Sequence, residues 1–226
     1  MKVCAGVLTW NMFKTGRDAM FRDTIESLKN GNYPLDLVVV TNGSDDGTQD
    51  VVAKLGGIVD DSNGEIWYGM VVAIEECIRR GADLVVFSAD DGLYSPGWLR
   101  KLVAFWRDMP DEVKIVCPHL SPSWPEPHSW NTVRGFIDGQ GGMRGLVRDS
   151  APGSFWTFRA SDWPLIKSLM PEKSPGEDLI VSQALADQGY MVVEVDLCEH
   201  IGAFLSAWGN KSYEWATPLD RERWGI

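Results

Sequence analysis

Acidic side chains and one histidine stand at positions in this chain where they could take part in chemistry. Asp90 and Asp91 directly follow a short apolar run, Glu177 and Asp178 begin a predicted helix, and His200 follows a predicted strand. Grouped carboxylates repel one another unless a cation or a donor-rich ligand offsets their charge. Carboxylate oxygens suit Mn²⁺ or Mg²⁺, and such an ion can neutralise a leaving diphosphate. These residues therefore predict a site for a divalent metal and a diphosphate.

The first half of the chain alternates between strand and helix patterns, and these elements must bring the acidic residues together. Short apolar runs rich in β-branched residues are typical of strands buried on both faces, and apolar residues at helical spacing predict amphipathic helices. We expect strands at residues 3–9, 37–41, 58–59, 83–88 and 113–117, and helices at residues 17–30, 49–55, 67–80 and 98–109. This order predicts an α/β fold, a mostly parallel sheet flanked by helices, with ligands bound beyond the carboxyl ends of its strands.

The second half of the chain follows a less regular pattern. Residues 118–153 are rich in Pro and Gly and show no periodicity, which is typical of a functional or mobile segment. We expect strands at residues 155–159 and 191–197, a short helix from residue 161 and a helix at residues 177–189. The sequence shows no internal repeat or domain boundary, so the prediction is a single domain over residues 1–226 with a variable C-terminal region.

The composition argues against several classes of protein. The chain has 226 residues, of which 44% are apolar, and this fraction is too high for a disordered chain. No apolar run reaches the roughly 18 residues that a membrane span needs, so we expect no transmembrane segment. The first residues are typical of a buried strand rather than a signal peptide. The net charge of −11 argues against strong, non-specific binding to nucleic-acid phosphates.

The cysteines predict neither a zinc site nor a redox motif. They are far apart in the sequence, and no two have the CxxC spacing. We expect each to be a buried free thiol in a reducing environment, which places the protein in the cytoplasm. The four are Cys4, Cys77, Cys117 and Cys198.

Motifs along most of the chain resemble those of one enzyme family. A first strand ending in Thr9-Trp10-Asn11 is followed by VVVTNGSDDGT (38–48), VVFSADDGLYSPGWLRKL (85–102), GSFWTFR (153–159), GEDL (176–179) and EHIG (199–202). In this order they resemble a family 2 glycosyltransferase with the Rossmann-like GT-A fold. The resemblance implies inverting, metal-dependent transfer of a sugar from a nucleotide-diphospho-sugar to an acceptor hydroxyl. It also implies a nucleotide-sugar-binding half at residues 1–117 and an acceptor-binding half at residues 118–226.

The resemblance further implies contacts to the donor in the loops after the first two strands. The family's turn usually reads DDGSTDGT, and its counterpart here is residues 41–48, in which both leading Asp are replaced. Asn42 still offers a hydrogen-bond donor and an acceptor to the edge of a base. Asp46 matches the N-cap of the following helix better than a ligand contact. The implied donor contacts are Thr9, Asn11, Thr41, Asn42, Gly43, Ser44 and Asp90.

The family's Asp-x-Asp metal motif aligns with Ala89-Asp90-Asp91. The resemblance implies that Asp91 is a metal ligand, and that Asp90 replaces the ribose contact that is lost at Ala89. It also implies that His200 completes the metal site or touches the diphosphate, because an imidazole is an acceptable ligand for manganese. An Asp pair at this position could instead cap the loop, which is the less favoured interpretation.

The Glu-Asp pair of the family aligns with Glu177 and Asp178. The resemblance implies that Asp178 is the catalytic base, and that Glu177 raises the pKa of this base or holds the acceptor. Two acids in the first turn of a helix could instead serve its dipole. Phe155 and Trp156 occupy positions that line the acceptor side in the family.

Two further functions remain as alternatives, and a third is disfavoured. Thr41, Asn42 and Ala89 depart from the family pattern, which fits a non-catalytic nucleotide-sugar or carbohydrate-binding protein on the same scaffold. A nucleotidyltransferase is less favoured, because its first loop would need more basic and Gly residues than Lys14 and its neighbours supply. A dehydrogenase is disfavoured because no Gly-rich motif follows the first strand. The sequence leaves open whether the acceptor is a glycan, a lipid, a protein or a modified nucleobase.

Overall fold

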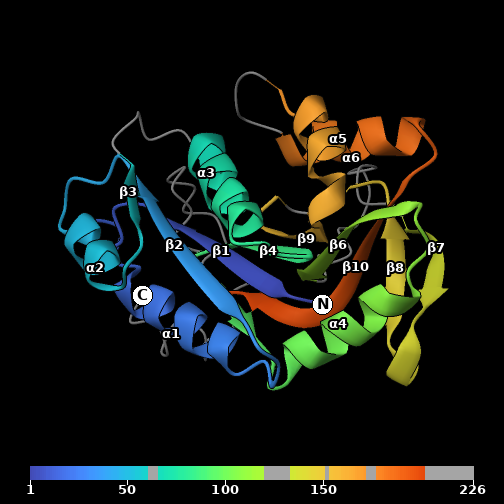
Figure 1. Ribbon diagram of the computed structural model, residues 1–226, viewed down its shortest axis with the longest axis horizontal. Helices are drawn as coiled ribbons and strands as arrows, with labels where there is room; N and C mark the ends of the chain where they lie inside the picture. The colour runs from blue at the N-terminus through green and yellow to red at the C-terminus, as the bar shows by residue number, and fades with distance from the viewer. Residues whose placement is uncertain (61–65, 120–132, 151–152, 172–176, 202–226) are drawn as a thin grey trace, which may run out of the picture.

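The computed structural model describes residues 1–60, 66–119, 133–150, 153–171 and 177–201. Figure 1 shows a sheet with α1 and α4 along one side and α3, α5 and α6 along the other. Side-chain contacts agree with this division, because Gly31 after α1 packs against Leu99 of α4, and Trp163 of α5 reaches Glu75 of α3. The α/β fold with flanking helices, predicted from the sequence, is therefore confirmed.

The N-terminal half forms the parallel part of the sheet. Strand β1 pairs in parallel with β2 on one side and with β4 on the other, and β2 pairs with β3. All seven residues of β1 are buried, as expected for a strand covered on both faces. The bounds match the predicted ranges within two residues: β1 Val3–Thr9, α1 Asp18–Lys29, β2 Asp36–Asn42, α2 Thr48–Lys54, β3 Ile58–Asp60, α3 Ile66–Arg79 and β4 Leu84–Ala89.

The C-terminal half forms the mixed part of the sheet. Strand β9 runs antiparallel between β4 and β6, and β10 is parallel to β6 but antiparallel to β5 and β8. The strand order is β3-β2-β1-β4-β9-β6-β10-β8-β7, with β5 paired to β10. The elements are β5 Gly92–Tyr94, α4 Trp98–Asp108, β6 Val113–His119, β7 Val133–Asp138, β8 Arg144–Arg148, β9 Phe155–Arg159, α5 Trp163–Leu169, α6 Glu177–Asp187 and β10 Met191–His200, with short 3-10 helices at Gln140–Gly142 and Ala160–Asp162.

Part of the segment expected to lack regular structure is a hairpin. Strands β7 and β8 pair antiparallel within residues 118–153. The prediction failed here because β7 is mostly exposed and therefore lacks the apolar run that marks a buried strand. A glycine is required in β8, since a Cβ at Gly145 would lie 2.4 Å from Cγ1 of Val193. Residues 120–132 of this segment lie outside the described part.

Tryptophans and thiols fill the core. Trp98 and Trp106 are fully buried on α4, and their indole N–H groups donate to Leu28 O at 3.2 Å and to Thr157 Oγ1 at 2.9 Å. All four cysteines are buried and free, as predicted. None of the helices in the described residues is both long enough and apolar enough to cross a membrane.

Candidate active site

The ends of three neighbouring strands place the predicted loops at one edge of the sheet. In the parallel register Thr9 lies beside Thr41, and Leu8 beside Ala89, so β1, β2 and β4 end together. The long strand β10 arrives from the C-terminal half, and its last residue, His200, lies opposite Gly92. His200 is therefore brought to the edge of the sheet where the loop after β1, the loop after β2 and the pair Asp90–Asp91 begin, although it lies more than 100 positions from that pair in the sequence.

The two residues predicted to bind the metal are brought together. His200 Nε2 lies 3.3 Å from Asp91 Oδ2, and the backbone N–H of Ile201 donates to the carbonyl of Asp91 at 2.8 Å. The Asp91 side chain is only 6% exposed, whereas that of His200 is 28% exposed. The carboxylate is thus held inside, while the imidazole reaches toward the surface.

Arg17 joins this pair, although the sequence analysis did not identify it. Its guanidinium bonds to Asp91 Oδ2 at 2.7 Å and also contacts Asp90 Oδ1. Arg17 lies just before α1, more than 70 positions from the two acids, and a single arginine at a helix start carries no recognisable signal. The surplus of acid at this edge could have indicated that a basic partner was needed.

Burial and the neighbouring charges shift the pKa values of the two acids in opposite directions. Burial raises the pKa of Asp90 above the usual range for a carboxyl, although Arg17 opposes the rise. Burial acts in the same direction on Asp91, but the charges of His200 and Arg17 outweigh it and lower the pKa of Asp91. Asp91 therefore keeps its negative charge to a lower pH than Asp90 does.

Asp90 holds the start of the loop after β1 through buried contacts. One of its carboxylate oxygens accepts a hydrogen bond from Thr9 Oγ1 at 2.6 Å, and the other contacts Arg17. Thr9 and Asp90 are 1% and 2% exposed. Both predicted donor contacts thus lie beneath the surface in this structure, where they fix the position of the loop and of Arg17.

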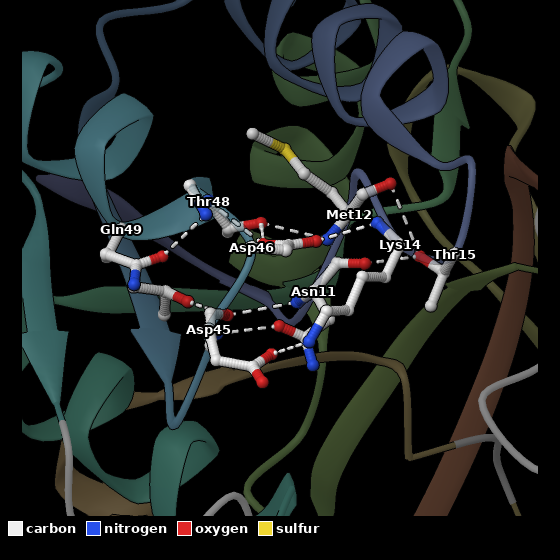
Figure 2. Close-up of polar contacts among 11 residues, drawn as sticks. Asn11, Met12, Lys14, Thr15, Asp45, Asp46, Thr48 and Gln49 are labelled. Carbon is white, nitrogen blue, oxygen red and sulfur yellow. Dashed lines mark hydrogen bonds and ion pairs between the residues drawn. The ribbon is translucent and has the colours of Figure 1, made fainter.

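Hydrogen bonds clamp the loop after β1 to the loop after β2 (Figure 2). The Asn11 backbone N–H donates to Ser44 Oγ at 3.0 Å, and Asn11 Oδ1 accepts from the N–H of Asp45 at 2.9 Å. Asn11 adopts the left-handed backbone conformation, with φ of 44°, which an Asn tolerates better than most residues. The predicted donor residues Asn11 and Ser44 therefore hold each other's loops in place.

A second set of bonds completes the same clamp. Asp46 accepts from the N–H of Lys14 at 2.7 Å, and from both the N–H and the hydroxyl of Thr48 at 3.1 and 2.6 Å. Thr48 Oγ1 in turn accepts from the N–H of Met12 at 3.0 Å. The N-cap of α2 is Gly47 and not Asp46 as predicted, but the bond from the Thr48 N–H to Asp46 still satisfies a donor in the first turn of this helix.

The remaining predicted donor contacts line the turn after β2. Thr41 and Asn42 are buried, and the hydroxyls of Thr41 and Ser44 lie 2.6 Å apart. Gly43 has φ of 64° and donates its N–H to Asp60 O at 2.8 Å. Gly43 and Ser44 are half-buried, so this turn presents small groups and backbone at its surface.

The predicted catalytic base lies close to the same edge. Asp178 is the second residue of α6, and its carboxylate accepts from the N–H of Gly153 at 3.2 Å and from the N–H of its neighbour Leu179 at 2.8 Å. The next residue in the chain, Ser154, accepts at its carbonyl from the N–H of Ala89 at 2.8 Å. The segment 153–154 therefore connects Asp178 directly to the end of β4. The side chain of Glu177 lies outside the described part of the structure.

Phe155 and Trp156 are fully buried, so neither ring presents a face to an acceptor in this structure. The centroid of the Phe155 ring lies 5.1 Å from that of His200, in an edge-on arrangement. The family resemblance implied that both rings line the acceptor side, and no local pattern in the sequence showed how deep β9 lies. Its antiparallel pairing with β4 and β6 instead puts it inside the sheet, where both faces are covered.

His119 is a second residue that the sequence analysis did not place in the site. Its ring lies 5.9 Å from that of His200, and its Nδ1 donates to the carbonyl of Cys198 at 3.1 Å. Burial lowers the pKa of His119 to about 4, so the ring is neutral at pH 7. Together with Phe155, this neutral ring supports His200 from inside the protein.

The donor set at Asp91 fits a divalent ion that takes further ligands from a substrate. Asp91 Oδ1 is buried, and no group in the described residues donates to it. The described residues contain no cluster of three or more His, Cys, Asp or Glu side chains suited to a metal. Mg²⁺ and Mn²⁺ in nucleotide enzymes use one or two protein ligands together with phosphate oxygens. Asp91 and His200 supply one oxygen and one nitrogen of this kind.

Comparison with solved structures supports the fold. A mannosyltransferase from Pyrobaculum calidifontis, PcManGT, in complex with GDP-Man and Mn²⁺, superposes with a TM-score of 0.62 at 17% identity, covering 88% of this chain and 57% of that one. Residues 1–349 of TarS from S. aureus superpose with a TM-score of 0.58 at 15% identity, covering 88% of this chain and 60% of that one. The fold is thus of the GT-A type.

Comparison at the sequence level shows the family. A glucosyl-dolichyl phosphate glucuronosyltransferase from Haloferax volcanii is 32% identical over 131 residues, which are 55% of this chain and 40% of that protein. The chain therefore matches well under half of the length of this relative. Residues 14–163, more than half of the chain, match the model of glycosyl transferase family 2. The chain belongs to glycosyl transferase family 2.

Proposed function

We propose that this chain is an inverting, metal-dependent glycosyltransferase that moves a sugar from a nucleotide-diphospho-sugar to an acceptor hydroxyl. The observation that carries the proposal is the contact between Asp91 and His200 beyond the end of β4, together with the bond from Gly153 to Asp178 beside the bond that joins Ser154 to Ala89. Membership of glycosyl transferase family 2 supports the same activity.

The relatives support the donor class. PcManGT is described with GDP-Man and Mn²⁺, and TarS residues 1–349 with UDP and with UDP-GlcNAc. In this chain hydrogen bonds hold the loops after β1 and β2 together without a ligand, and Gly43 and Ser44 in the turn after β2 are only half-buried. Such a preformed surface suits a flat base and a ribose, because little ordering remains to be done on binding.

Asp91 and His200 would hold the divalent ion. When bound, the ion neutralises the charge that develops on the departing diphosphate. Asp91 suits this role because its carboxylate is ionised at neutral pH and one of its oxygens is buried without a donor among the described residues. The side chain of His200 is partly exposed, so its imidazole can reach a ligand from the open side.

Asp178 would act as the general base. The acceptor oxygen attacks the anomeric carbon, the bond from that carbon to the diphosphate breaks with its electron pair, and the proton of the acceptor hydroxyl passes to the Asp178 carboxylate. Two backbone N–H groups, those of Gly153 and Leu179, orient this carboxylate. Inversion follows when the base and the diphosphate lie on opposite faces of the sugar.

The metal-dependent step of donor binding can be tested by calorimetric titration of UDP, GDP and dTDP with and without Mn²⁺. We expect Mn²⁺ to strengthen the binding of at least one nucleotide by roughly tenfold or more, which is about 1.4 kcal/mol. The Asp91→Asn variant should lose this gain. Equal affinity with and without Mn²⁺ would remove Asp91 and His200 from the proposed role.

The catalytic role of Asp178 can be tested by replacing it with Asn. We expect release of nucleoside diphosphate from a panel of sugar nucleotides to fall on the order of 10²- to 10⁴-fold, as for loss of a general base, while nucleotide binding stays unchanged. Asp187→Asn, at the exposed end of the same helix, is the matched control and should keep wild-type turnover. Unchanged turnover in Asp178→Asn would assign the base elsewhere, and binding without turnover in the wild type would favour a non-catalytic binding protein.

A further inference from the structure

Arg17 places a positive charge against the two carboxylates at the proposed metal site. Its guanidinium contacts Asp90 and lies 2.7 Å from Asp91 Oδ2. The Arg17 side chain is only 10% exposed. Within the described part of the chain, Arg17 Nε and Asp91 Oδ1 are buried and have no hydrogen-bond partner. Since buried polar groups are normally satisfied, this cluster still has one acceptor and one donor that a ligand can engage.

The backbone holds Arg17 in this position. Its N–H donates to Met12 O at 2.7 Å, and its carbonyl accepts from the N–H of Phe21 in the first turn of α1. The loop that precedes it is clamped to the loop after β2 through Asn11. The guanidinium therefore enters the acidic cluster from a fixed anchor and not from a freely moving surface segment.

The charges of the cluster do not favour a metal ion alone. Two carboxylates and one guanidinium, if all are ionised, leave a net charge of −1 for a divalent cation to neutralise. Asp91 Oδ2 is already shared by Arg17 and His200, so an ion at Asp91 would lie within a few ångströms of a fixed positive charge. Inside a protein such like-charge repulsion is weakly screened. A diphosphate adds negative charge and offsets the repulsion.

We propose that Arg17 competes with the divalent ion for Asp91, so that the ion binds tightly only together with the nucleotide diphosphate. The inference rests on the proposed function, in which Asp91 holds the ion. Arg17 is then a positioning residue that couples the binding of metal and nucleotide. After transfer, when the nucleoside diphosphate leaves, Arg17 again neutralises the acid pair, and this favours departure of the ion with the product.

The coupling can be measured from the Mn²⁺ electron paramagnetic resonance signal, which reports free Mn²⁺, in titrations of the full chain with and without UDP or GDP. We expect Arg17→Gln to bind Mn²⁺ alone about tenfold more tightly than the wild type, because it removes the competing charge. The gain that the nucleotide confers on Mn²⁺ binding should shrink by a similar factor. Arg17→Lys keeps the charge and should keep most of the coupling.

Arg22→Gln is the matched control, because Arg22 lies on the same helix and pairs with Asp18 at the exposed surface. It should bind Mn²⁺ as the wild type does. If the wild type and Arg17→Gln bind Mn²⁺ equally well without nucleotide, the inference is wrong and the proposed function stands. If neither binds Mn²⁺ even with UDP or GDP, the proposed metal role fails, and the inference fails with it.

A measurement on the wild-type chain covers the case in which Arg17→Gln does not fold. The Nε–H resonance of Arg17 can be followed in a ¹⁵N-labelled sample. It is assigned as the resonance that is missing from the spectrum of Arg17→Lys. Mg²⁺ alone should leave this resonance in place, whereas Mg²⁺ with UDP or GDP should shift it. A shift of the same size with Mg²⁺ alone would contradict the competition.

Discussion

The donor side and the base side of the candidate site are held in different ways. On the donor side, Asn11, Asp46 and Asp90 tie the loops to one another and to the strand ends through side-chain hydrogen bonds. On the base side, Asp178 is oriented by two backbone N–H groups at the start of a helix. In the proposed function, the donor surface is therefore formed before binding, whereas the position of the proposed base depends on the short segment beside it.

On the donor side, the largest effect is expected from removing the charge of Asp91. Asp91→Asn removes the ionised carboxylate that would hold the metal, so turnover should fall by about 10²-fold or more. The variant should still bind nucleotide weakly, because the clamped loops remain. Rates of nucleoside diphosphate release measure the loss. Asp111→Asn, at a side chain that is 98% exposed, is the control, and a turnover in Asp91→Asn close to that of this control would break the comparison.

A smaller effect is expected on the stability of the folded protein at acidic pH, and it arises from His119. Because burial lowers the pKa of His119 to about 4, the folded protein takes up a proton less readily than the unfolded chain, whose histidine titrates at about 6.5. Stability should therefore fall as the pH drops from 6.5 toward 4. In His119→Phe this loss should shrink by about 2 kcal/mol at pH 4.5, as measured by urea unfolding at pH 7 and pH 4.5. An unchanged loss would show that other groups dominate the acid response.

The smallest effect is expected from opening the clamp between the two loops. Asn11→Ala removes the bond from the Asp45 N–H to the Asn11 side chain and also strains the left-handed backbone, so stability should fall by about 1–2 kcal/mol. Nucleotide affinity should weaken several-fold if the donor surface is preformed. Asn11→Gly also lacks the side-chain bond but carries no backbone strain, so its difference from Asn11→Ala separates the two causes. Full nucleotide affinity in both variants would mean that the clamp serves stability and not binding.

Much of the fold could be predicted because buried strands leave a strong pattern. Residues 37–40 and 84–87 are continuously apolar, and both lie in strands that form within two residues of the expected bounds. The hairpin β7–β8 could not be predicted, since β7 is largely exposed and owes its position to pairing with β8. A sequence pattern that reflects burial does not reveal a strand that is defined by hydrogen bonding alone.

Part of the site could be predicted from the sequence, because that part depends on where strands end. Strand ends can be inferred from the sequence, so the meeting of Asp91 and His200 follows from the topology. The role of Arg17 could not be inferred, because its contact depends on how the first loop folds back through Asn11. Phe155 was expected at the acceptor side, but its depth depends on which strands flank β9, and the sequence does not encode that order in any local pattern.

The contacts of residues 153 and 154 set a dimension of the molecule. Gly153 touches the carboxylate of Asp178, and a Cβ there would lie 3.1 Å from the Cβ of Asp178, while Ser154 binds the last residue of β4. This dipeptide thus sets the spacing between Asp178, the proposed base, and the end of β4. An inserted residue here would change the distance between the proposed base and the proposed metal site.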